Sequence, residues 1–210
     1  MSTRSAVAGS GLPGGAGQEV LRSRRRFSVD EYYAMARAGI LTEDERVELL
    51  AGEIVEMTPI GIRHAVCVGG LTDLFSRRFG DRVLVWVQNP VRLDRNSEPE
   101  PDVVLVRRPL ERYAGAHPVP EDVLLIVEVA DTSLERDRAL KLPLYAGAGI
   151  VDVWIINVEE REVEVYRQPS GDRYAQVQHF REGTVTPLAF PNEAVDIEEI
   201  LGPTPSASPA

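Results

Sequence analysis

One run of seven residues, VLLIVEV at 123–129, constrains the fold more than any other part of the sequence. It is apolar almost throughout, a pattern typical of a central β-strand that is covered on both faces. Such a strand needs helices on either side of its sheet, which predicts an α/β fold with a mixed central sheet flanked by helices. Glu128 is the only charge in the run. Because an ionised carboxylate is costly in a covered strand, Glu128 either pairs with an arginine at the sheet edge or serves function, and we favour function.

Shorter patterns predict the elements around this strand. Ser28 and Glu31 form a capping-box pattern that starts a first helix, and Val68, Leu71 and Phe75 have helical spacing within a second helix over 63–79. The remaining strands are expected as two short segments within 46–57 joined at Ala51-Gly52, then 83–87, 91–93, 103–106, 151–157, 162–167 and 173–180, with a turn at 169–171 before the last.

The chain of 210 residues suits one domain with tails. We expect 1–26, which is rich in Gly, Ser and Ala before it turns basic, and 202–210 to be flexible tails around a folded unit at 27–201. No apolar stretch approaches the roughly 18 residues of a membrane span, and the first residues lack the apolar segment of a secretory signal. The single cysteine, Cys67, cannot form an intramolecular disulfide, so we expect a cytoplasmic protein with no membrane partner.

The charge distribution excludes one class of DNA-binding protein. The formal net charge is −10, and the five arginines and one glutamate of 1–26 give that segment +4, which leaves −14 on the other 184 residues. A protein that coats DNA by general electrostatics carries the opposite sign, because phosphate neutralisation dominates non-specific affinity. A nucleic-acid role for this chain therefore requires a local basic surface, a bound metal ion or brief encounters.

The basic residues are unevenly divided between the two types. Of 23 lysines and arginines, Lys141 is the only lysine. Either it survived a general bias toward arginine, or arginine cannot replace it, because lysine is a compact charge whose pKa shifts readily. Lys141 belongs to a helix that follows 123–129 and ends near 148–149. Pro143 lies inside this helix, so we expect the helix to begin close to Lys141 or to be kinked there.

Two carboxylates are expected to meet at one edge of the sheet. Asp102 directly precedes the strand at 103–106, and Glu128 lies near the end of 123–129. If these strands are antiparallel neighbours, the beginning of the first lies beside the end of the second. Such a pair of carboxylates suits Mg²⁺, which prefers oxygen ligands. Glu48 is a candidate third carboxylate, although a solvated position on its strand explains it equally well.

Four segments carry a family resemblance, namely VELLAGEIVEM, EPEPDVVLV, LLIVEVADTSLERDRALKLPLYAGAGIVDVWIINV and EVEVYR. They contain, in order, Pro-Asp, Glu-Val followed by a serine, and then Asp, Lys, Tyr, Gly and Trp. In these features the sequence resembles the Uma family within the PD-(D/E)XK nuclease superfamily, over most of 46–167. The resemblance implies a restriction-endonuclease-like core.

The resemblance also assigns residues. Pro101-Asp102 matches the first motif pair and Glu128 the second acidic position, whereas Ala130 stands where the superfamily normally has its lysine. In the Uma family the lysine has moved to the following helix, which points to Lys141, and Glu48 matches an additional acidic position. The implied protein is a Mg²⁺-dependent endonuclease, with Mn²⁺ as a substitute, that hydrolyses phosphodiester bonds in DNA and often forms a homodimer.

Under this hypothesis Asp102 and Glu128 hold the metal, Glu48 assists directly or through water, and Lys141 orients the water or stabilises developing charge. Two alternatives stay open. The first is a nuclease fold that has lost catalysis and acts as a binding or interaction module, and the second is a different phosphohydrolase acting on nucleotides or RNA. Of the other residues, His64 is interpreted as a capping or exposed histidine rather than an acid–base group, and Cys67 as core.

Overall fold

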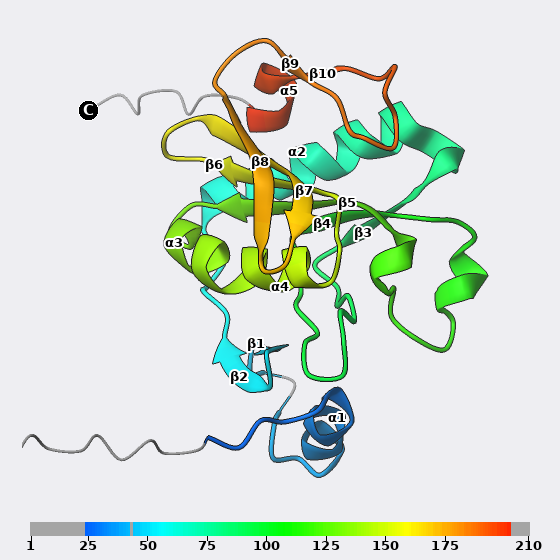
Figure 1. The fold of residues 1–210 in the computed structure, drawn as a ribbon, viewed down its shortest axis with the longest axis vertical. Helices are drawn as coiled ribbons and strands as arrows, with labels where there is room; N and C mark the ends of the chain where they lie inside the picture. Colours follow the sequence, from blue (N-terminus) through cyan, green and yellow to red (C-terminus); the bar gives the residue numbers. More distant parts are fainter. Residues whose placement is uncertain (1–23, 43, 203–210) are drawn as a thin grey trace, which may run out of the picture.

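The computed structural model describes residues 24–42 and 44–202. Its centre is a six-stranded sheet in the order β3-β4-β5-β6-β7-β8, with β5 parallel to β6 and all other neighbours antiparallel. The strands are β3 (Leu84–Val87), β4 (Val103–Val106), β5 (Val123–Ala130), β6 (Asp152–Asn157), β7 (Glu162–Ser170) and β8 (Arg173–Phe180). Helices lie on both faces of this sheet (Figure 1), which confirms the predicted α/β fold.

The central strand β5 divides the hydrophobic core into two layers. Leu125 and Val127 belong to the layer beneath α2 (Ile62–Phe79) and α5 (Ile197–Leu201), whereas Ile126 belongs to the layer on the opposite face. Successive side chains of a strand point to opposite faces. Glu128 therefore shares its face with Ile126, inside the second layer.

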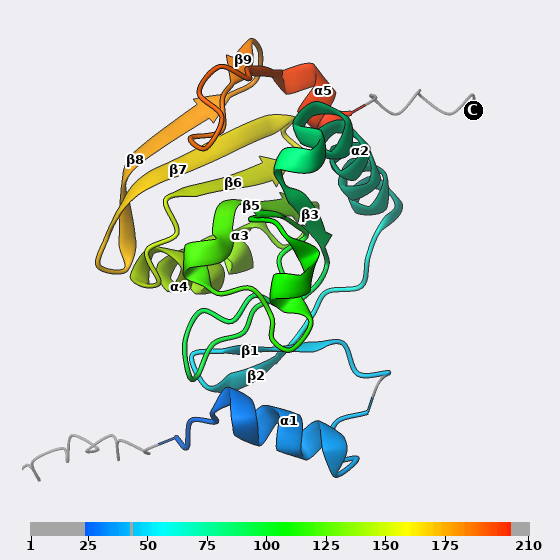
Figure 2. The same ribbon diagram turned by 90° about the vertical axis from the view of Figure 1, so that its right-hand side faces the viewer.

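The second layer is covered by a helix that changes its winding. It consists of α3 (Leu134–Arg136), a π-helical turn (Asp137–Lys141) and α4 (Leu142–Gly147). Figures 1 and 2 show α3 and α4 along the lower side of the sheet, where α4 contacts β7 and β8. The Leu142 N–H donates to the Asp137 carbonyl, five residues earlier. The wide turn follows from Pro143, which lacks an N–H and whose ring would clash with the carbonyl four residues before it. The predicted irregularity near Lys141 is thus a π turn.

The first residues of the described chain form a small module against the loop before β4. Helix α1 (Val29–Arg37) has the predicted capping box, and β1 (Val47–Leu50) pairs with β2 (Glu53–Glu56) in a hairpin. Ala51 and Gly52 both have positive φ, as the tightest hairpin turns require. A side chain at Gly52 would collide with Arg26 and the Phe27 backbone. The hairpin lies below the sheet in both views (Figures 1 and 2).

Several details differ from the pattern-based expectations. Residues 91–93 are not a strand: the N–H groups of Val91 and Leu93 donate to the carbonyls of Pro99 and Ser97, within a loop that folds back on itself. Both apolar side chains are buried there, which produces a strand-like alternation without a ladder. A second small sheet, β9 (Thr184–Val185) with β10 (Val195–Asp196), was not expected, and short 3-10 helices occupy Gly80–Arg82, Leu110–Tyr113 and Pro120–Asp122.

Both expected tails lie almost wholly outside the described residues, which exclude 1–23 and 203–210. The last three residues of the expected N-terminal tail are described: Arg24 and Arg26 form ion pairs with Glu53 of the hairpin at 3.5 and 3.1 Å, and Arg25 pairs with Glu31 of α1. Within the described ranges, the search for a helix with the length and apolar character of a membrane span finds none.

Candidate active site

A cavity of about 150 Å³ opens where β4 begins and β5 ends. The β1–β2 hairpin, the segment 57–61, the first turn of α2 and the start of α3 form its walls. The four side chains predicted as site residues, Glu48, Asp102, Glu128 and Lys141, all line this cavity. Residues from four separate elements are therefore brought together at one position.

Asp102 and Glu128 converge through the strand register, as the antiparallel argument predicted. Val103 of β4 pairs with Val127 of β5, so Asp102 and Glu128 are opposite each other on the same face of the sheet. The Asp102 carboxylate accepts a hydrogen bond from the Val129 N–H at 2.8 Å. Glu128 lies deeper, with 2% of its surface exposed, and accepts a hydrogen bond from the Tyr145 hydroxyl.

Lys141, the only lysine of the chain, lies at the centre of the carboxylates. Its Nζ is 3.2 Å from Glu128 Oε1 and 3.4 Å from Glu48 Oε2, and it lies 3.5 Å from the Glu100 carbonyl oxygen. Lys141 is 5% exposed. The π turn brings this ammonium group from the helix to the end of β5, where Ala130 stands two residues after Glu128.

Glu48 reaches the cavity because the hairpin is attached to the loop before β4. The Leu49 backbone forms an isolated bridge with Glu98, and the Glu100 N–H donates to Glu48 at 3.1 Å. Glu48 also pairs with Arg136 of α3 at 3.0 Å. It is almost fully buried, which excludes the alternative of a solvated strand position.

The predicted set of site residues omitted two further side chains at the cavity, one of which is the aspartate of the family pattern. Asp137 is buried, and its carboxylate accepts a hydrogen bond from Ser133 Oγ at 2.6 Å. It lies four residues before Lys141, a helical spacing that could have identified it once Lys141 was suspected. Arg136, the ion-pair partner of Glu48, had no comparable signal, because arginines are abundant in this sequence.

His64 does not match its expected position. It lies in the first turn of α2 with 14% of its side chain exposed, and its Nε2 is 2.9 Å from Asp102 Oδ1. The Nδ1 atom is buried and has no hydrogen-bond partner among the described residues. His64 is thus neither a cap nor an exposed residue. Cys67, one turn further on, is buried as expected, and burial raises the pKa of its thiol to about 12.

The electrostatics of the cavity are dominated by acids. Burial raises the pKa of Glu128 to about 8 despite the nearby Lys141 charge, and burial also raises the pKa of Asp137 and of Glu100. For Lys141, burial acts to lower the pKa, but attraction from Glu128, Glu48 and the neighbouring aspartates raises it above its usual value. The ammonium group therefore stays charged, and the surplus of charge in the cavity is negative.

This surplus suits a divalent cation. Among the described residues that line the cavity, the acids outnumber the lysine and arginine side chains: Glu48, Glu100, Asp102, Glu128, Asp131 and Asp137 stand against Arg46, Arg136 and Lys141. Glu48, Asp102, Glu128 and Asp137 all offer carboxylate oxygens, the donor type that Mg²⁺ prefers. A divalent cation would offset the mutual repulsion that helps to raise the pKa of Glu128. The donor set of this cavity therefore fits the expected metal.

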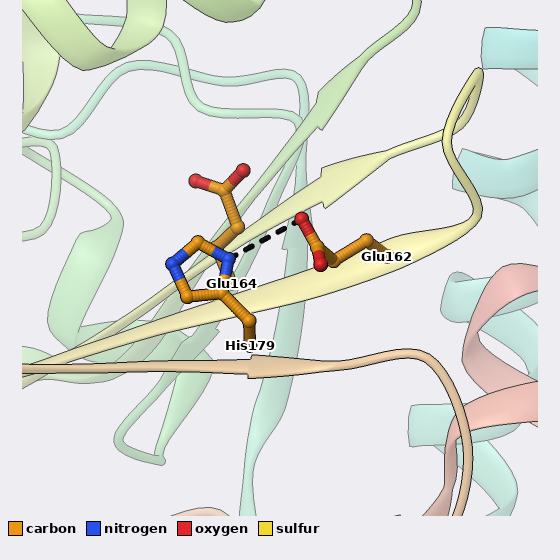
Figure 3. Close-up of side chains that lie close together, drawn as sticks. All are labelled: Glu162, Glu164 and His179. Carbon is orange, nitrogen blue, oxygen red and sulfur yellow. Dashed lines mark hydrogen bonds and ion pairs between the residues drawn. The ribbon is translucent and has the colours of Figure 1, made fainter.

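A second group of potential ligands lies on the same face of the sheet as Glu128, but further along the sheet, on β7 and β8. In the described part of the chain, Glu162, Glu164 and His179 form the one group of three whose ligand atoms all lie within 4.8 Å of one another (Figure 3). Arginines already balance its acids, because Arg138 binds the buried Glu164 and Arg181 binds Glu162 at 3.2 Å. This group therefore lacks the negative surplus of the cavity.

Comparisons with known proteins agree with the architecture. The profile of the Uma2 family, described as "Putative restriction endonuclease", matches residues 29–198. Among solved structures, a putative nuclease belonging to DUF820 from Anabaena variabilis ATCC 29413 superposes with a TM-score of 0.66 at 15% identity, covering 83% of this chain and 97% of that one. At this identity the likeness concerns the fold alone. No curated protein matches the chain.

Proposed function

The chain belongs to the Uma2 family, and from this premise we propose that it is a Mg²⁺-dependent endonuclease that hydrolyses phosphodiester bonds in DNA. The observation that carries the proposal is the meeting of Asp102 and Glu128 at one edge of the sheet, with Lys141 Nζ 3.2 Å from Glu128. Family and fold support a nuclease of the restriction-endonuclease type. Metal, substrate and residue roles are our proposal.

Each residue has a part that its position supports. Asp102 and Glu128 would hold the metal, and Glu48 would assist directly or through water. When bound, the metal would polarise a phosphodiester oxygen and lower the pKa of its water. The Val129 N–H and His64 fix the two oxygens of Asp102, and Tyr145 fixes Glu128, so the ligands are oriented before substrate arrives.

Lys141 supplies the positive charge at the reacting phosphate. Its ammonium group is held by Glu48, Glu128 and the Glu100 carbonyl, and its raised pKa keeps it protonated at neutral pH. A fixed charge of this kind stabilises negative charge that develops in the transition state, without reorganisation during the reaction. An arginine fits this position poorly, because its planar guanidinium is larger than the compact ammonium group.

The decisive test is cleavage of supercoiled plasmid and of single-stranded DNA by purified protein with Mg²⁺, Mn²⁺ or EDTA. We expect metal-dependent nicking that is abolished by Asp102→Asn and by Lys141→Ala. Asp172→Asn is the matched control, because Asp172 is exposed in the turn between β7 and β8 and its loss should change nothing. An Asp102→Asn protein that cleaves as fast as wild type would falsify the proposal.

Two other results would redirect it. Folded protein that binds nucleic acid without cleaving it in any metal would indicate an inert binding module. The net charge of −14 outside the first 26 residues favours such a module and argues against a protein that binds DNA tightly by general electrostatics. Hydrolysis of mononucleotide esters but not of polynucleotides would indicate a different phosphohydrolase. A homodimer stays a prediction, which sedimentation of the purified protein checks.

A further inference from the structure

The three lysine and arginine side chains that line the cavity differ in how deeply they are buried. The most buried cation, Lys141, is enclosed by Glu48, Glu128 and the Glu100 carbonyl, so it acts on an entering group through its charge rather than through a free N–H donor. The arginines that line the cavity, Arg46 and Arg136, lie on elements of its wall, at the start of β1 and in α3. A group entering from solvent thus encounters guanidinium groups as well as carboxylates.

Arg136 is only partly used by the protein. Its Nη2 donates to Glu48 Oε1 at 3.0 Å, and 24% of its side chain is exposed. Its Nε is buried and has no hydrogen-bond partner among the described residues. An arginine presents five N–H donors in a fixed planar arrangement. The described residues use one of these donors, so Arg136 keeps donors for an acceptor that enters the cavity it lines.

Arg46, directly before β1, supplies a second guanidinium group to the cavity lining. Arg46 is exposed, and its Nη1 donates a hydrogen bond to the Thr58 carbonyl oxygen at 3.4 Å. Across 24–42 and 44–202, no carboxylate lies within 4.0 Å of it. Its charge nevertheless acts on the cavity: burial and Glu48 raise the pKa of Glu100, and Arg46 opposes that rise.

The size of the cavity limits what these arginines can receive. A volume of about 150 Å³ is below the 300–1,000 Å³ typical of pockets that enclose whole small molecules. A cavity of this size suits a phosphate group better than a whole nucleotide. Guanidinium groups match the planar, paired oxygen acceptors of a phosphate better than any other side chain.

We propose that Arg136 and Arg46 form a phosphate clamp that holds the backbone phosphodiester of a nucleic-acid strand in the cavity and leaves its bases outside. The clamp rests on the proposed function, which it deepens by naming the substrate group that is recognised. Because the contacts are to phosphate, they position the strand and carry no base specificity. Base preference, where the enzyme has any, then originates outside this cavity.

Binding is measured separately from cleavage. The Asp102→Asn background prevents turnover under the proposed mechanism, and fluorescence anisotropy of a labelled oligothymidylate is recorded with Mg²⁺ and with EDTA at several salt concentrations. The variants are Arg46→Gln, Arg136→Gln and Arg136→Lys, each checked for folding by thermal melting. Arg173→Gln is the matched control, because Arg173 is exposed and pairs only with its neighbour Asp172 at 3.8 Å. Cleavage by the wild-type protein is assayed in parallel.

We expect each clamp variant to raise the dissociation constant about tenfold and to reduce the salt slope by about one, with no change for Arg173→Gln. Oligonucleotides with abasic residues should bind as well as intact ones, and a neutral methylphosphonate backbone should remove the difference between variants and wild type. If Arg136→Gln does not fold, Arg46→Gln and Arg136→Lys carry the test.

Folded clamp variants that bind like the control overturn the inference, and so does loss of binding to abasic strands. The result is independent of catalysis. If the wild-type protein fails to cleave DNA but both arginine variants bind it more weakly, the nuclease proposal is refuted and the clamp is retained. If the wild-type protein cleaves DNA and the arginine variants bind it with unchanged affinity, the clamp is refuted and the nuclease proposal is retained.

Discussion

Two buried glutamates on the same sheet, Glu128 of β5 and Glu164 of β7, differ in what surrounds them. Each is paired with one basic side chain, Lys141 in the first case and Arg138 in the second. Around Glu128 the nearby acids outnumber the cations, and its pKa is raised to about 8, first by burial. Around Glu164 the arginine and the Tyr166 hydroxyl satisfy both carboxylate oxygens.

The comparison shows that a buried acid is not by itself a functional signal. Burying a paired acid is tolerated when hydrogen bonds satisfy it, and breaking such a pair destabilises the fold. A surplus of acids that lack cations has no structural benefit, because like charges repel and desolvation adds to the cost. The charge balance around each glutamate, rather than its burial, therefore separates the candidate active site from the structural pair.

The largest expected difference between the two glutamates concerns catalysis. Glu128→Gln should reduce metal-dependent DNA cleavage by about a thousandfold or more, because a ligand and the fixed charge pattern are lost together. Glu164→Gln should keep cleavage within about twofold once the protein is folded. Initial rates of plasmid nicking measure both. Equal losses of cleavage in the two variants would contradict a functional role for Glu128 and a structural role for Glu164.

The second difference concerns stability. Glu164→Gln should lower the free energy of unfolding by about 2 kcal/mol, because the partly exposed Arg138 loses its charged acceptor. Glu162→Gln is the matched change on the same strand, where Glu162 pairs with the exposed Arg181, and it should cost less than about 0.5 kcal/mol. Urea unfolding followed by circular dichroism compares them. A larger loss for Glu162→Gln contradicts the account.

Metal affinity gives a third comparison, between the two histidines that contact carboxylates. His64→Ala should weaken Mn²⁺ binding about tenfold, because it removes the group that orients Asp102 Oδ1. His179→Ala should leave the affinity unchanged, although His179, Glu162 and Glu164 form the one group in the described residues whose ligand atoms all lie within 4.8 Å of one another (Figure 3). Isothermal titration with the metal alone decides this. Loss of binding in His179→Ala instead would move the metal site to β7 and β8.

The smallest effect is a dependence of stability on pH. Folding raises the pKa of Glu128 from its ordinary 4.5 to about 8, so the folded protein binds more protons than the unfolded chain between these values. Stability therefore falls as pH rises through this window, while Lys141 stays protonated. In EDTA, Tm should be a few degrees lower at pH 8 than at pH 5.5. Added Mg²⁺ should reduce that difference, and a flat profile in EDTA would contradict the burial of an uncompensated Glu128.

Much of the fold could be predicted from local patterns, because those patterns record burial. The apolar run at 123–129 identified the central strand, and the capping box at Ser28 identified the start of α1. The loop at 91–93 misled the same reasoning, since its alternating apolar residues are buried without pairing in a sheet. Periodicity reports which side chains are covered but not what covers them.

The sequence by itself determined that Glu128 is buried, that Asp102 lies beside it if the two strands are antiparallel, and that Lys141 is singular. Only the tertiary structure decided which groups complete the cavity. His64 and Arg136 reach it through the packing of α2 and the winding of the helix after β5. Contacts between separate elements depend on their relative position and rotation, and the forces that set these act between distant residues, so no local pattern records them.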